Sequence, residues 1–259
     1  MKIFLKKLLY KFLRRQEIEA KYTIVSLGSE YGNWKFLNLD NLYNSTIISA
    51  GAGEDISFDI EFINMYKSKV IFVDPTPKAL QHLNMVKKGL GKPKTEEYVD
   101  GGSQKINSYN LEKVSSKDFI ILNNALWNKS KKILKFYFPD NNNYVSNTLI
   151  KNPLKRKKSR YISVESIELS EIILKEELEK LVLIKIDIEG AEVKVVSSMM
   201  KKQIYPIQIL LEIDYIRKNT IYSIIKSFLL ISKLIIHGYK LIKIKDYENY
   251  LFVRKEVFN

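Results

Sequence analysis

The sequence predicts an α/β domain with a mostly parallel β-sheet. Short apolar runs rich in β-branched residues recur along the chain, and longer amphipathic runs separate most of them. This alternation is typical of βαβ units, in which a helix connects two parallel strands. Because no linker-like boundary interrupts the pattern, we expect one α/β domain over residues 31–259, preceded by a helical appendage over residues 1–30.

The clearest βαβ unit lies near the start of this domain. A buried strand is expected over residues 46–50, a turn with two glycines follows it, and a helix is expected over residues 54–66. The second strand, residues 70–73, ends on Asp74. The unit therefore places a glycine turn and a carboxylate at the same edge of a parallel sheet.

The middle of the chain predicts a helix, an insertion and further strands. Pro77 predicts the start of a helix over residues 77–88, in which His82 is expected to be structural. Residues 89–117 are rich in turn formers and charges, so we expect a surface insertion there. Strands are expected over residues 119–123, 133–138 and 161–164, and residues 31–34 are expected to form a loop that places aromatic side chains over a pocket.

The last third of the chain continues the alternation. Ser170 predicts the cap of a helix over residues 170–180, and another helix is expected to begin within residues 187–192. A third helix is expected to end at His237, where a cation and a following glycine both belong. Strands are expected over residues 181–186, 207–213, 239–245 and 250–254, the last two as an antiparallel hairpin, and the third helix over residues 221–236.

Composition limits the class of protein. A chain of 259 residues with 46% hydrophobic residues can bury a sizeable core, which excludes a disordered chain. The lack of cysteine excludes a disulfide framework and Cys-ligated zinc, and two histidines leave little room for a histidine metal site. Lysines interrupt the apolar N-terminal stretch, so neither a secretory signal nor a membrane span is expected. We therefore expect a cytoplasmic protein.

The formal net charge of +14 is concentrated in two runs. Residues 1–15 predict a basic amphipathic helix that could lie on the inner face of an anionic membrane. Packing against the domain or a partner subunit is the alternative. Residues 151–160 form the second run, which suits an anionic acceptor, anionic lipid or nucleic acid, or else a solvated surface.

The glycine turn favours a nucleoside ligand without phosphate. Gly51 and Gly53 allow close approach of a ligand, and Asp74 can accept hydrogen bonds from ribose hydroxyls. A dinucleotide fingerprint would need glycine at the position of Ile56. Glu54 and the aspartate that follows it, expected in the first helical turn, repel a pyrophosphate and suit a cation. S-adenosylmethionine is such a ligand, because its sulfonium and ammonium groups are positive. The alternative is a turn that binds nothing.

Carboxylates also follow the later strands. Asp187 and Glu189 come directly after one expected strand, and either could act as a general base, Asp187 first. Asp187 could instead be a helix cap, and Glu189 and Glu192 could belong to a solvated first helical turn. Lys185 shares a strand face with Asp187 and could pair with it. A magnesium site that adds Glu212 and Asp214 lacks a dedicated ligand spacing, so no metal site is predicted.

Five segments together resemble the FkbM-type family of S-adenosylmethionine-dependent methyltransferases: GAGEDISFD, VDPTP, NNALW, VSNT and KIDIEGAE. The resemblance covers roughly residues 31–255, and KIDIEGAE is its most specific part. It implies the class I methyltransferase (Rossmann-like) fold, a seven-stranded mostly parallel sheet with helices on both faces and a C-terminal antiparallel hairpin. Family members are mostly O-methyltransferases that act on sugars or natural products.

The resemblance also implies cofactor contacts. The turn formed by Gly51, Ala52 and Gly53 would hold the methionine part, Asp74 the ribose, and Asn124 with Ala125 the adenine edge. Glu54 stands where many members carry a small or apolar residue, and we expect it to contact the ammonium group of S-adenosylmethionine.

The leading hypothesis is therefore an O-methyltransferase for a sugar hydroxyl in a glycan or another small acceptor, which could be anionic or lipid-linked. Residues 146–148 could meet this acceptor through hydroxyl and amide groups, or could form a plain polar loop. The alternatives are an RNA methyltransferase, or a non-catalytic membrane-surface protein that kept the fold. Nucleic acid is not the expected partner, because the aromatic residues fall mostly inside apolar runs.

Overall fold

The computed structural model describes residues 22–137, 161–213, 220–242 and 249–259. The basic segments over residues 1–15 and 151–160, and the acceptor contact considered for residues 146–148, lie outside these residues and stay predictions. Within the described part of the chain, no helix is both long enough and apolar enough to cross a lipid bilayer.

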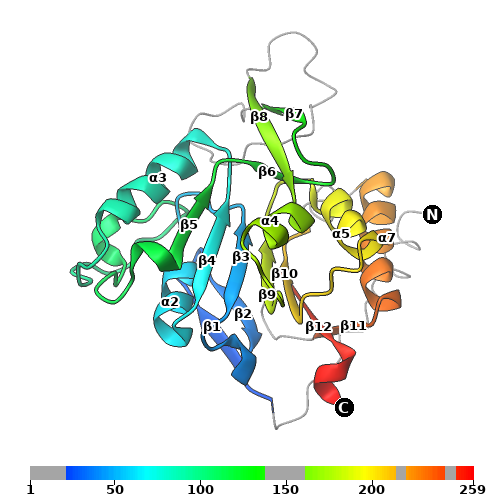
Figure 1. Cartoon of the computed structure of the whole chain (residues 1–259), viewed down its shortest axis with the longest axis horizontal. Helices are drawn as coiled ribbons and strands as arrows, with labels where there is room; N and C mark the ends of the chain where they lie inside the picture. Colours follow the sequence, from blue (N-terminus) through cyan, green and yellow to red (C-terminus); the bar gives the residue numbers. More distant parts are fainter. Residues whose placement is uncertain (1–21, 138–160, 214–219, 243–248) are drawn as a thin grey trace.

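A seven-stranded mixed sheet forms the centre of the molecule (Figure 1). The five strands from β10 to β5 are parallel, β12 is antiparallel to β10, and β11 pairs antiparallel with β12. The predicted α/β class with a large, mostly parallel sheet is therefore confirmed. The turn of the predicted C-terminal hairpin lies in residues 243–248, outside the described residues. From edge to edge the order is β11 (Tyr239–Ile242), β12 (Tyr250–Arg254), β10 (Gln208–Leu211), β9 (Leu183–Ile186), β3 (Thr46–Ala50), β4 (Lys69–Val73) and β5 (Phe119–Leu122).

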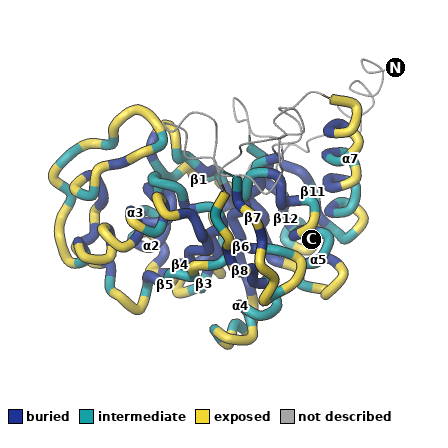
Figure 2. Tube along the Cα trace, turned by 90° about the horizontal axis from the view of Figure 1, so that it is seen from above, coloured by how far each residue is buried: buried dark blue, intermediate teal, exposed yellow. Residues whose placement is uncertain are grey.

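Helices cover both faces of this sheet. Side chains alternate along β3, so Ile47 packs in the apolar core beneath one set of helices and Ile48 packs in the core beneath the other. Figure 2 shows the buried strands enclosed between the two layers. The first layer holds α2 (Ser57–Tyr66) and α3 (Pro77–Lys88), and the second holds α4 (Leu169–Lys175), α5 (Glu192–Lys201) and α7 (Ile221–Ile236).

An N-terminal hairpin lies against the first layer. β1 (Ile24–Leu27) pairs antiparallel with β2 (Trp34–Leu37) outside the main sheet. The amide side chain of Gln208 on β10 joins them, because its Oε1 accepts from Leu37 N at 2.8 Å and its Nε2 donates to Leu37 O at 2.9 Å. The predicted boundary at residue 30 therefore falls in the turn of a hairpin whose second strand is fastened to the sheet.

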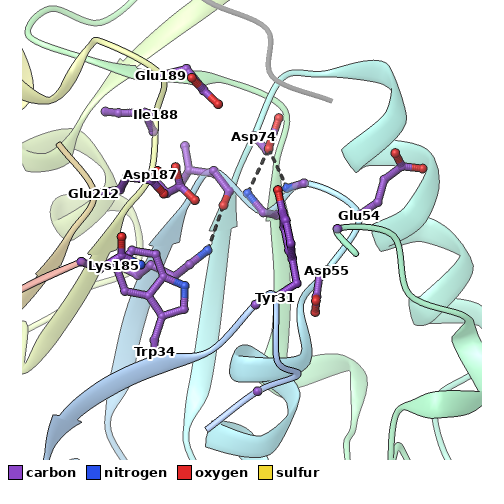
Figure 3. A pocket seen from close by; sticks show the side chains of 18 of the residues that line it. Tyr31, Trp34, Glu54, Asp55, Asp74, Lys185, Asp187, Ile188, Glu189 and Glu212 are labelled. Atoms are coloured by element: carbon purple, nitrogen blue, oxygen red, sulfur yellow. Dashed lines mark hydrogen bonds between the residues drawn. The ribbon is translucent and has the colours of Figure 1, made fainter. Parts of the chain in front are cut away.

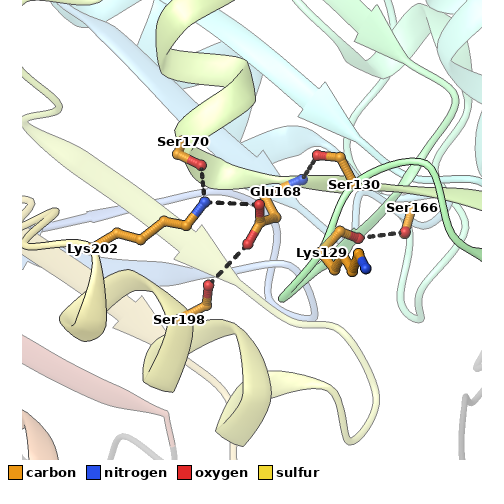
Figure 4. Close-up of polar contacts among 7 residues, drawn as sticks. All are labelled: Lys129, Ser130, Ser166, Glu168, Ser170, Ser198 and Lys202. Atoms are coloured by element: carbon orange, nitrogen blue, oxygen red, sulfur yellow. Dashed lines mark hydrogen bonds and ion pairs between the residues drawn. The ribbon is translucent and has the colours of Figure 1, made fainter.

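A second sheet of three strands follows β5. β8 (Tyr161–Glu168) pairs parallel with β6 (Ala125–Trp127) and antiparallel with β7 (Ile133–Tyr137). Glu168 fastens this sheet to α5, because its carboxylate accepts from Lys202 Nζ at 2.8 Å and from Ser198 Oγ at 3.2 Å (Figure 4). The sequence predicted β7 and the start of β8, but no strand was assigned to the residues of β6.

Several predicted boundaries are wrong for local reasons. α2 begins at Ser57 rather than residue 54, since Ile56 is its N-cap. α4 begins at Leu169, so Ser170 lies inside its first turn and Glu168 is the N-cap. In contrast, α3 and α7 match their predicted bounds. Both carry the sequence signals of a start or an end, namely Pro77 in the first turn and His237 at the C-cap.

Residues 89–117 are more than the surface insertion that was expected. Tyr109, Leu111 and Val114 are buried in the same apolar core as α2 and α3. His82 on α3 lies 2.8 Å from Tyr109 Oη through its Nε2, and burial lowers the pKa of His82 to about 4. His82 is therefore a neutral core residue, consistent with its expected structural role.

Candidate functional site

A cavity of about 780 Å³ opens at the carboxyl edge of the parallel strands. Nucleotide ligands bind at this edge in open α/β sheets, and cavities of this size hold small molecules. Figure 3 shows side chains around it from the segments that follow β3, β4, β9 and β10, from Lys185 on β9, and from the β1–β2 hairpin. Eight of the nine predicted site residues line it: Gly51, Ala52, Gly53, Glu54, Asp74, Ala125, Asp187 and Glu189.

Asn124 is the predicted residue that does not line the cavity. Its Nδ2 donates to Glu165 O at 3.4 Å on β8. Ala125 and Leu126, which follow it on β6, supply the lining at this position. An adenine contact by the Asn124 side chain therefore stays a prediction, whereas Ala125 already faces the cavity.

The two glycines of the turn have different surroundings. Gly51 has φ +83°, and a Cβ there would lie 1.7 Å from Asp187 O. Gly53 has φ +60°, and a Cβ there would meet no atom within 4 Å. Gly51 is therefore required by the approach of β3 to the end of β9. Gly53 faces open space beside the cavity, where a ligand can approach the backbone.

Asp74 holds the glycine turn against the end of β4. Its Oδ2 accepts from Ala52 N at 2.9 Å and from Gly53 N at 3.2 Å. Its Oδ1 accepts from Thr76 N and Thr76 Oγ1 at 2.8 and 2.7 Å. A carboxylate has about four acceptor positions, so Asp74 contacts ribose only by sharing or exchanging these bonds. The predicted closeness of Gly53 and Asp74 is confirmed, and the ribose contact stays a prediction.

Glu54 and Asp55 were expected in the first turn of α2. That expectation is wrong, because the helix begins at Ser57, two residues after Asp55. Glu54 Oε2 lies 3.9 Å from Lys78 Nζ on α3, and Figure 3 shows its side chain on the opposite side of Tyr31 from Asp187. Glu54 still lines the cavity. Its contact with an ammonium group stays a prediction.

Asp55 joins three segments around the cavity. Its Oδ2 accepts from Ser29 Oγ at 2.5 Å in the β1–β2 turn and from Gln104 Nε2 at 3.2 Å in the insertion. Its Oδ1 accepts from Ser57 N at 2.9 Å, at the start of α2. Hydrogen bonds to a charged carboxylate are stronger than neutral ones, so this residue fixes the cavity wall.

The β1–β2 turn supplies the aromatic wall that the sequence predicted. Tyr31 and Trp34 both line the cavity. Tyr31 is 70% exposed, and its ring lies so close to Gly102 that a Cβ there would be 2.6 Å from it. Trp34 is buried, and Lys185 Nζ lies 5.4 Å from the centre of its ring.

A buried charged cluster forms the floor of the cavity. Lys185 on β9 is 3% exposed, and its Nζ donates to Gly51 O at 2.9 Å. Its register partner on β3 is Ser49, which is fully buried, as is Asp59 on α2. Burial raises the pKa of Asp59, and the positive charge of Lys185 acts against that increase. Lys185 thus supports the glycine turn from below and supplies positive charge to a buried carboxyl group.

Asp187 lies at the end of β9, beside the glycine turn. Its backbone N donates to Ala50 O at 2.9 Å. The N-cap of α5 is Ala191, so the alternative role of Asp187 as a helix cap is excluded. Figure 3 shows Asp187 beside Glu212, the residue that follows β10, and both line the cavity. Asp187 therefore lines the cavity beside a second carboxylate, and its role as a general base stays a prediction.

Glu189 and Glu192 have different environments. Glu189 precedes α5, has φ +50° and lines the cavity, so it is not part of a helical turn. Glu192 is 1% exposed, and its Oε1 accepts from Gly190 N at 2.7 Å. The expectation that Glu192 is solvated is wrong, because its carboxylate closes the loop that carries Glu189.

The cavity is strongly acidic although the chain is basic. Seven carboxylate side chains and two lysines line it, whereas the formal net charge of the chain is +14. Among the described residues, no group of three or more His, Asp or Glu side chains is arranged to hold a metal ion. The lining favours a small organic cation. The acidic residues are Glu30, Glu54, Asp55, Asp74, Asp187, Glu189 and Glu212.

Sequence reasoning missed Asp59 and the contacts by which Ser29 and Gln104 are joined to Asp55. Asp59 shares a helical face with Phe62 and Tyr66, which are three and seven positions later, so helical spacing could have placed it inside. The roles of Ser29 and Gln104 depend on contacts with Asp55 at sequence separations of 26 and 49 residues. No local pattern carries that information.

A known protein family matches most of this chain. A family model described as the methyltransferase FkbM domain matches residues 48–241, which is about three quarters of the chain. The match begins within β3 and ends within β11, so it includes the glycine turn, Asp74 and the residues that follow β9. Neither the curated proteins nor the solved structures give a match to this chain.

Proposed function

We propose, from the premise that this chain belongs to the FkbM methyltransferase family, that it transfers a methyl group from S-adenosylmethionine to a hydroxyl group of a sugar or another small acceptor. The acidic cavity at the carboxyl edge of the sheet is the observation that carries the proposal. The order of the seven strands, with one antiparallel strand beside the edge strand, supports the class I methyltransferase fold.

The residues present fit S-adenosylmethionine. Its sulfonium and ammonium groups are positive, and seven carboxylate side chains line the cavity. Gly53 leaves open space beside the turn, and Ala125 offers a small apolar surface on the far wall. Residues 51–53 would hold the methionine part, Asp74 the ribose, and Ala125 the adenine edge. The bound sulfonium would supply an activated methyl group.

The residues of this chain would position the acceptor and remove its proton. A hydroxyl group is a poor nucleophile while protonated, so a carboxylate within hydrogen-bond reach accelerates the transfer. We assign this role to Asp187 first and to Glu189 second, because both line the cavity. Holding the acceptor oxygen in line with the methyl group accounts for much of the remaining rate increase. Tyr31 and Trp34 would exclude water from one side.

The acceptor class follows from the charge of the cavity wall. Asp187, Glu189 and Glu212 would repel an acceptor whose anionic group lies beside the reacting hydroxyl. We therefore propose a sugar or polyol that is neutral at this point. An anionic or lipid-linked remainder would have to lie outside the cavity, where the basic run over residues 151–160 could meet it.

Calorimetry with S-adenosylmethionine tests the proposal without a known acceptor. We expect binding of S-adenosylmethionine and of its demethylated product, and no binding of NAD, whose pyrophosphate the acidic wall repels. Asp187→Asn should keep the affinity for S-adenosylmethionine and slow methyl transfer by about 100-fold or more for any acceptor that the natural chain methylates. The matched control is Glu112→Gln, an exposed carboxylate outside the cavity. Binding of NAD in place of S-adenosylmethionine would contradict the proposal.

The RNA methyltransferase alternative is not favoured. The largest fully buried side chains include Tyr66, Tyr109, Tyr239 and Phe72, so these rings pack the core and are unavailable for stacking on bases. Copurification of nucleic acid, read from the ratio of absorbance at 260 and 280 nm, tests this alternative directly.

A further inference from the structure

The inner face of α7 is buried in the apolar core. Its buried residues pack in the same apolar cluster as β9, β10 and α5. The helix starts with a capping box, in which Thr220 Oγ1 accepts from Ser223 N at 3.1 Å and Ser223 Oγ accepts from Thr220 N at 2.8 Å. The inner face holds Ile224, Leu230, Ile231 and Leu234. The position and rotation of the helix are therefore fixed.

The outer face of α7 is also apolar. Five large apolar or aromatic residues on it are exposed, and Figure 2 shows the helix at the margin of the molecule. Their spacing of three, four and seven residues places them in one stripe along the helix. The outer stripe consists of Ile221 (37% exposed), Tyr222 (63%), Ile225 (44%), Leu229 (52%) and Ile236 (79%).

Lysines border this stripe, and carboxylates are absent from the helix. α7 contains Lys226 and Lys233 and neither Asp nor Glu. Lys226 Nζ lies 5.4 Å from the centre of the Tyr222 ring, at the edge of the stripe. Lys233 Nζ donates to Ser197 Oγ at 3.2 Å, at the boundary with α5. An apolar stripe with a basic border is the pattern of a helix that lies in a membrane interface.

We propose that the outer stripe of α7 lies on the surface of an anionic lipid bilayer. The stripe would enter the boundary between head groups and acyl chains, and Lys226 and Lys233 would meet anionic head groups. This surface is separate from the N-terminal segment, whose membrane contact was expected from the sequence. It is also independent of the proposed methyl transfer.

The size of the stripe favours a bilayer over a second copy of the chain. A stable protein interface takes about 20 to 30 residues from each partner, and this stripe offers five exposed apolar residues on one 16-residue helix. An identical partner would bring a second set of lysines to the same interface and no carboxylate from this helix to pair with them. A bilayer needs no surface of complementary shape, and its anionic head groups complement the positive charge of Lys226 and Lys233.

The topology places the stripe close to the site. α7 connects β10 to β11, which is parallel to β10, so its first turn lies at the carboxyl edge of the sheet, where the cavity opens (Figure 1). Ile221 and Tyr222 belong to this first turn. A bilayer on the stripe would therefore lie along the side of the domain. The end of the stripe that holds Ile221 and Tyr222 would be nearest the cavity.

A single fluorescent label gives the sharpest test. The natural chain has no cysteine, so Leu229→Cys in the full chain can be labelled at one position with the environment-sensitive dye NBD. The control is Leu174→Cys on α4, an isolated leucine that is 78% exposed. With vesicles of phosphatidylcholine and phosphatidylglycerol, we expect a blue shift and protection from aqueous iodide at position 229 and neither effect at position 174. Equal signals at both positions, or none at 229, would overturn the proposal.

Vesicle pelleting gives a second readout, with substitutions in the outer stripe and at the control position Leu174. Ile225→Glu/Leu229→Glu should lower the partition into anionic vesicles by about tenfold or more, because it replaces inserted side chains by carboxylates. Leu174→Glu should leave the partition unchanged. Circular dichroism verifies that both variants are folded. A dimer in light scattering that Leu229→Glu converts to a monomer would show that a second copy covers the stripe, and would overturn the bilayer proposal.

Discussion

Replacing Lys185 by methionine tests the role of the charged cluster under the glycine turn. The change keeps the length of the side chain but removes its charge and its hydrogen bond to Gly51 O. A hydrogen bond from a charged donor contributes about 1.5 to 3 kcal/mol. Asp59, which is fully buried, also loses the positive charge that favours its ionised form. We expect the free energy of unfolding to fall by about 2 to 4 kcal/mol at neutral pH.

The dependence of this loss on pH has a definite sign. Burial raises the pKa of Asp59 above its ordinary value, and removal of Lys185 raises it further. A carboxyl group whose folded-state pKa is raised stabilises the fold at low pH, and this stabilisation is lost as the pH rises through the folded-state pKa. The cost of Lys185→Met should therefore be larger at pH 8 than at pH 5. The double variant Lys185→Met/Asp59→Asn should recover part of the cost at pH 8.

Urea unfolding followed by tryptophan fluorescence measures these free energies, and calorimetry measures the affinity for S-adenosylmethionine. The matched control is Lys194→Met, because Lys194 Nζ also lies over a tryptophan ring, 4.5 Å from the centre of Trp127, but its side chain is exposed. The control should change stability by less than about 1 kcal/mol. If Lys185→Met costs no more than the control and leaves the affinity unchanged, the assignment of Lys185 as the support of the turn is wrong.

The remaining predictions concern the turn, the base and the core. Gly51→Ala should prevent folding or lower the free energy of unfolding by more than about 3 kcal/mol, because its Cβ would lie 1.7 Å from Asp187 O. Gly53→Ala should fold, with a loss of about 1 kcal/mol because of its positive φ, and should weaken binding of S-adenosylmethionine. Thermal melts measure the stability of both variants, and calorimetry measures the binding. With an acceptor in hand, Asp187→Asn should lower kcat by about 100-fold or more with the Kd for S-adenosylmethionine unchanged, and a normal kcat would exclude Asp187 as the base. Because the pKa of His82 is lowered to about 4, neutral His82 contributes to stability above pH 6.5. The free energy of unfolding should fall by up to about 3 kcal/mol between about pH 6.5 and 4, as His82 becomes protonated. In urea titrations, His82→Gln should flatten that part of the dependence of stability on pH.

The parts of the fold that the sequence predicts well are those whose signals are local. The helix that starts at Pro77 and the helix that ends at His237 have the predicted bounds, because a proline or a capping residue marks them. The buried strands were recognised from short apolar runs: β3 and β12 have the predicted bounds, and the ends of β4, β5, β9 and β10 differ by one or two residues. The strand β6 was missed because it has three residues and pairs with β8, about forty residues later.

In the site, too, some features could be predicted from the sequence and others could not. Gly51, Asp74 and Asp187 could be assigned to one edge because parallel strands end there, and the cavity brings them together. What the sequence could not show is which carboxylates the fold already uses. Asp55 joins three segments, and Asp74 accepts four hydrogen bonds. Both roles depend on backbone and side-chain atoms that only the folded chain brings within reach.

The opposite charges of the cavity and of the outer surface would allow this chain to bind the two proposed partners, a small cation and an anionic bilayer. Interactions between exposed charges are screened beyond about 8 to 10 Å at moderate salt, so the nearest groups decide the potential at each place. The carboxylates of the cavity therefore attract a small cation although the whole chain carries +14. The lysines that border the outer stripe of α7 would attract an anionic surface although acidic residues lie in the same domain. Because salt screens exposed charges more than enclosed ones, raising the salt concentration should weaken attachment to vesicles much more than binding of S-adenosylmethionine. If both fell equally, the two charged regions would not act independently, and the acidic cavity would no longer explain selection of a cation.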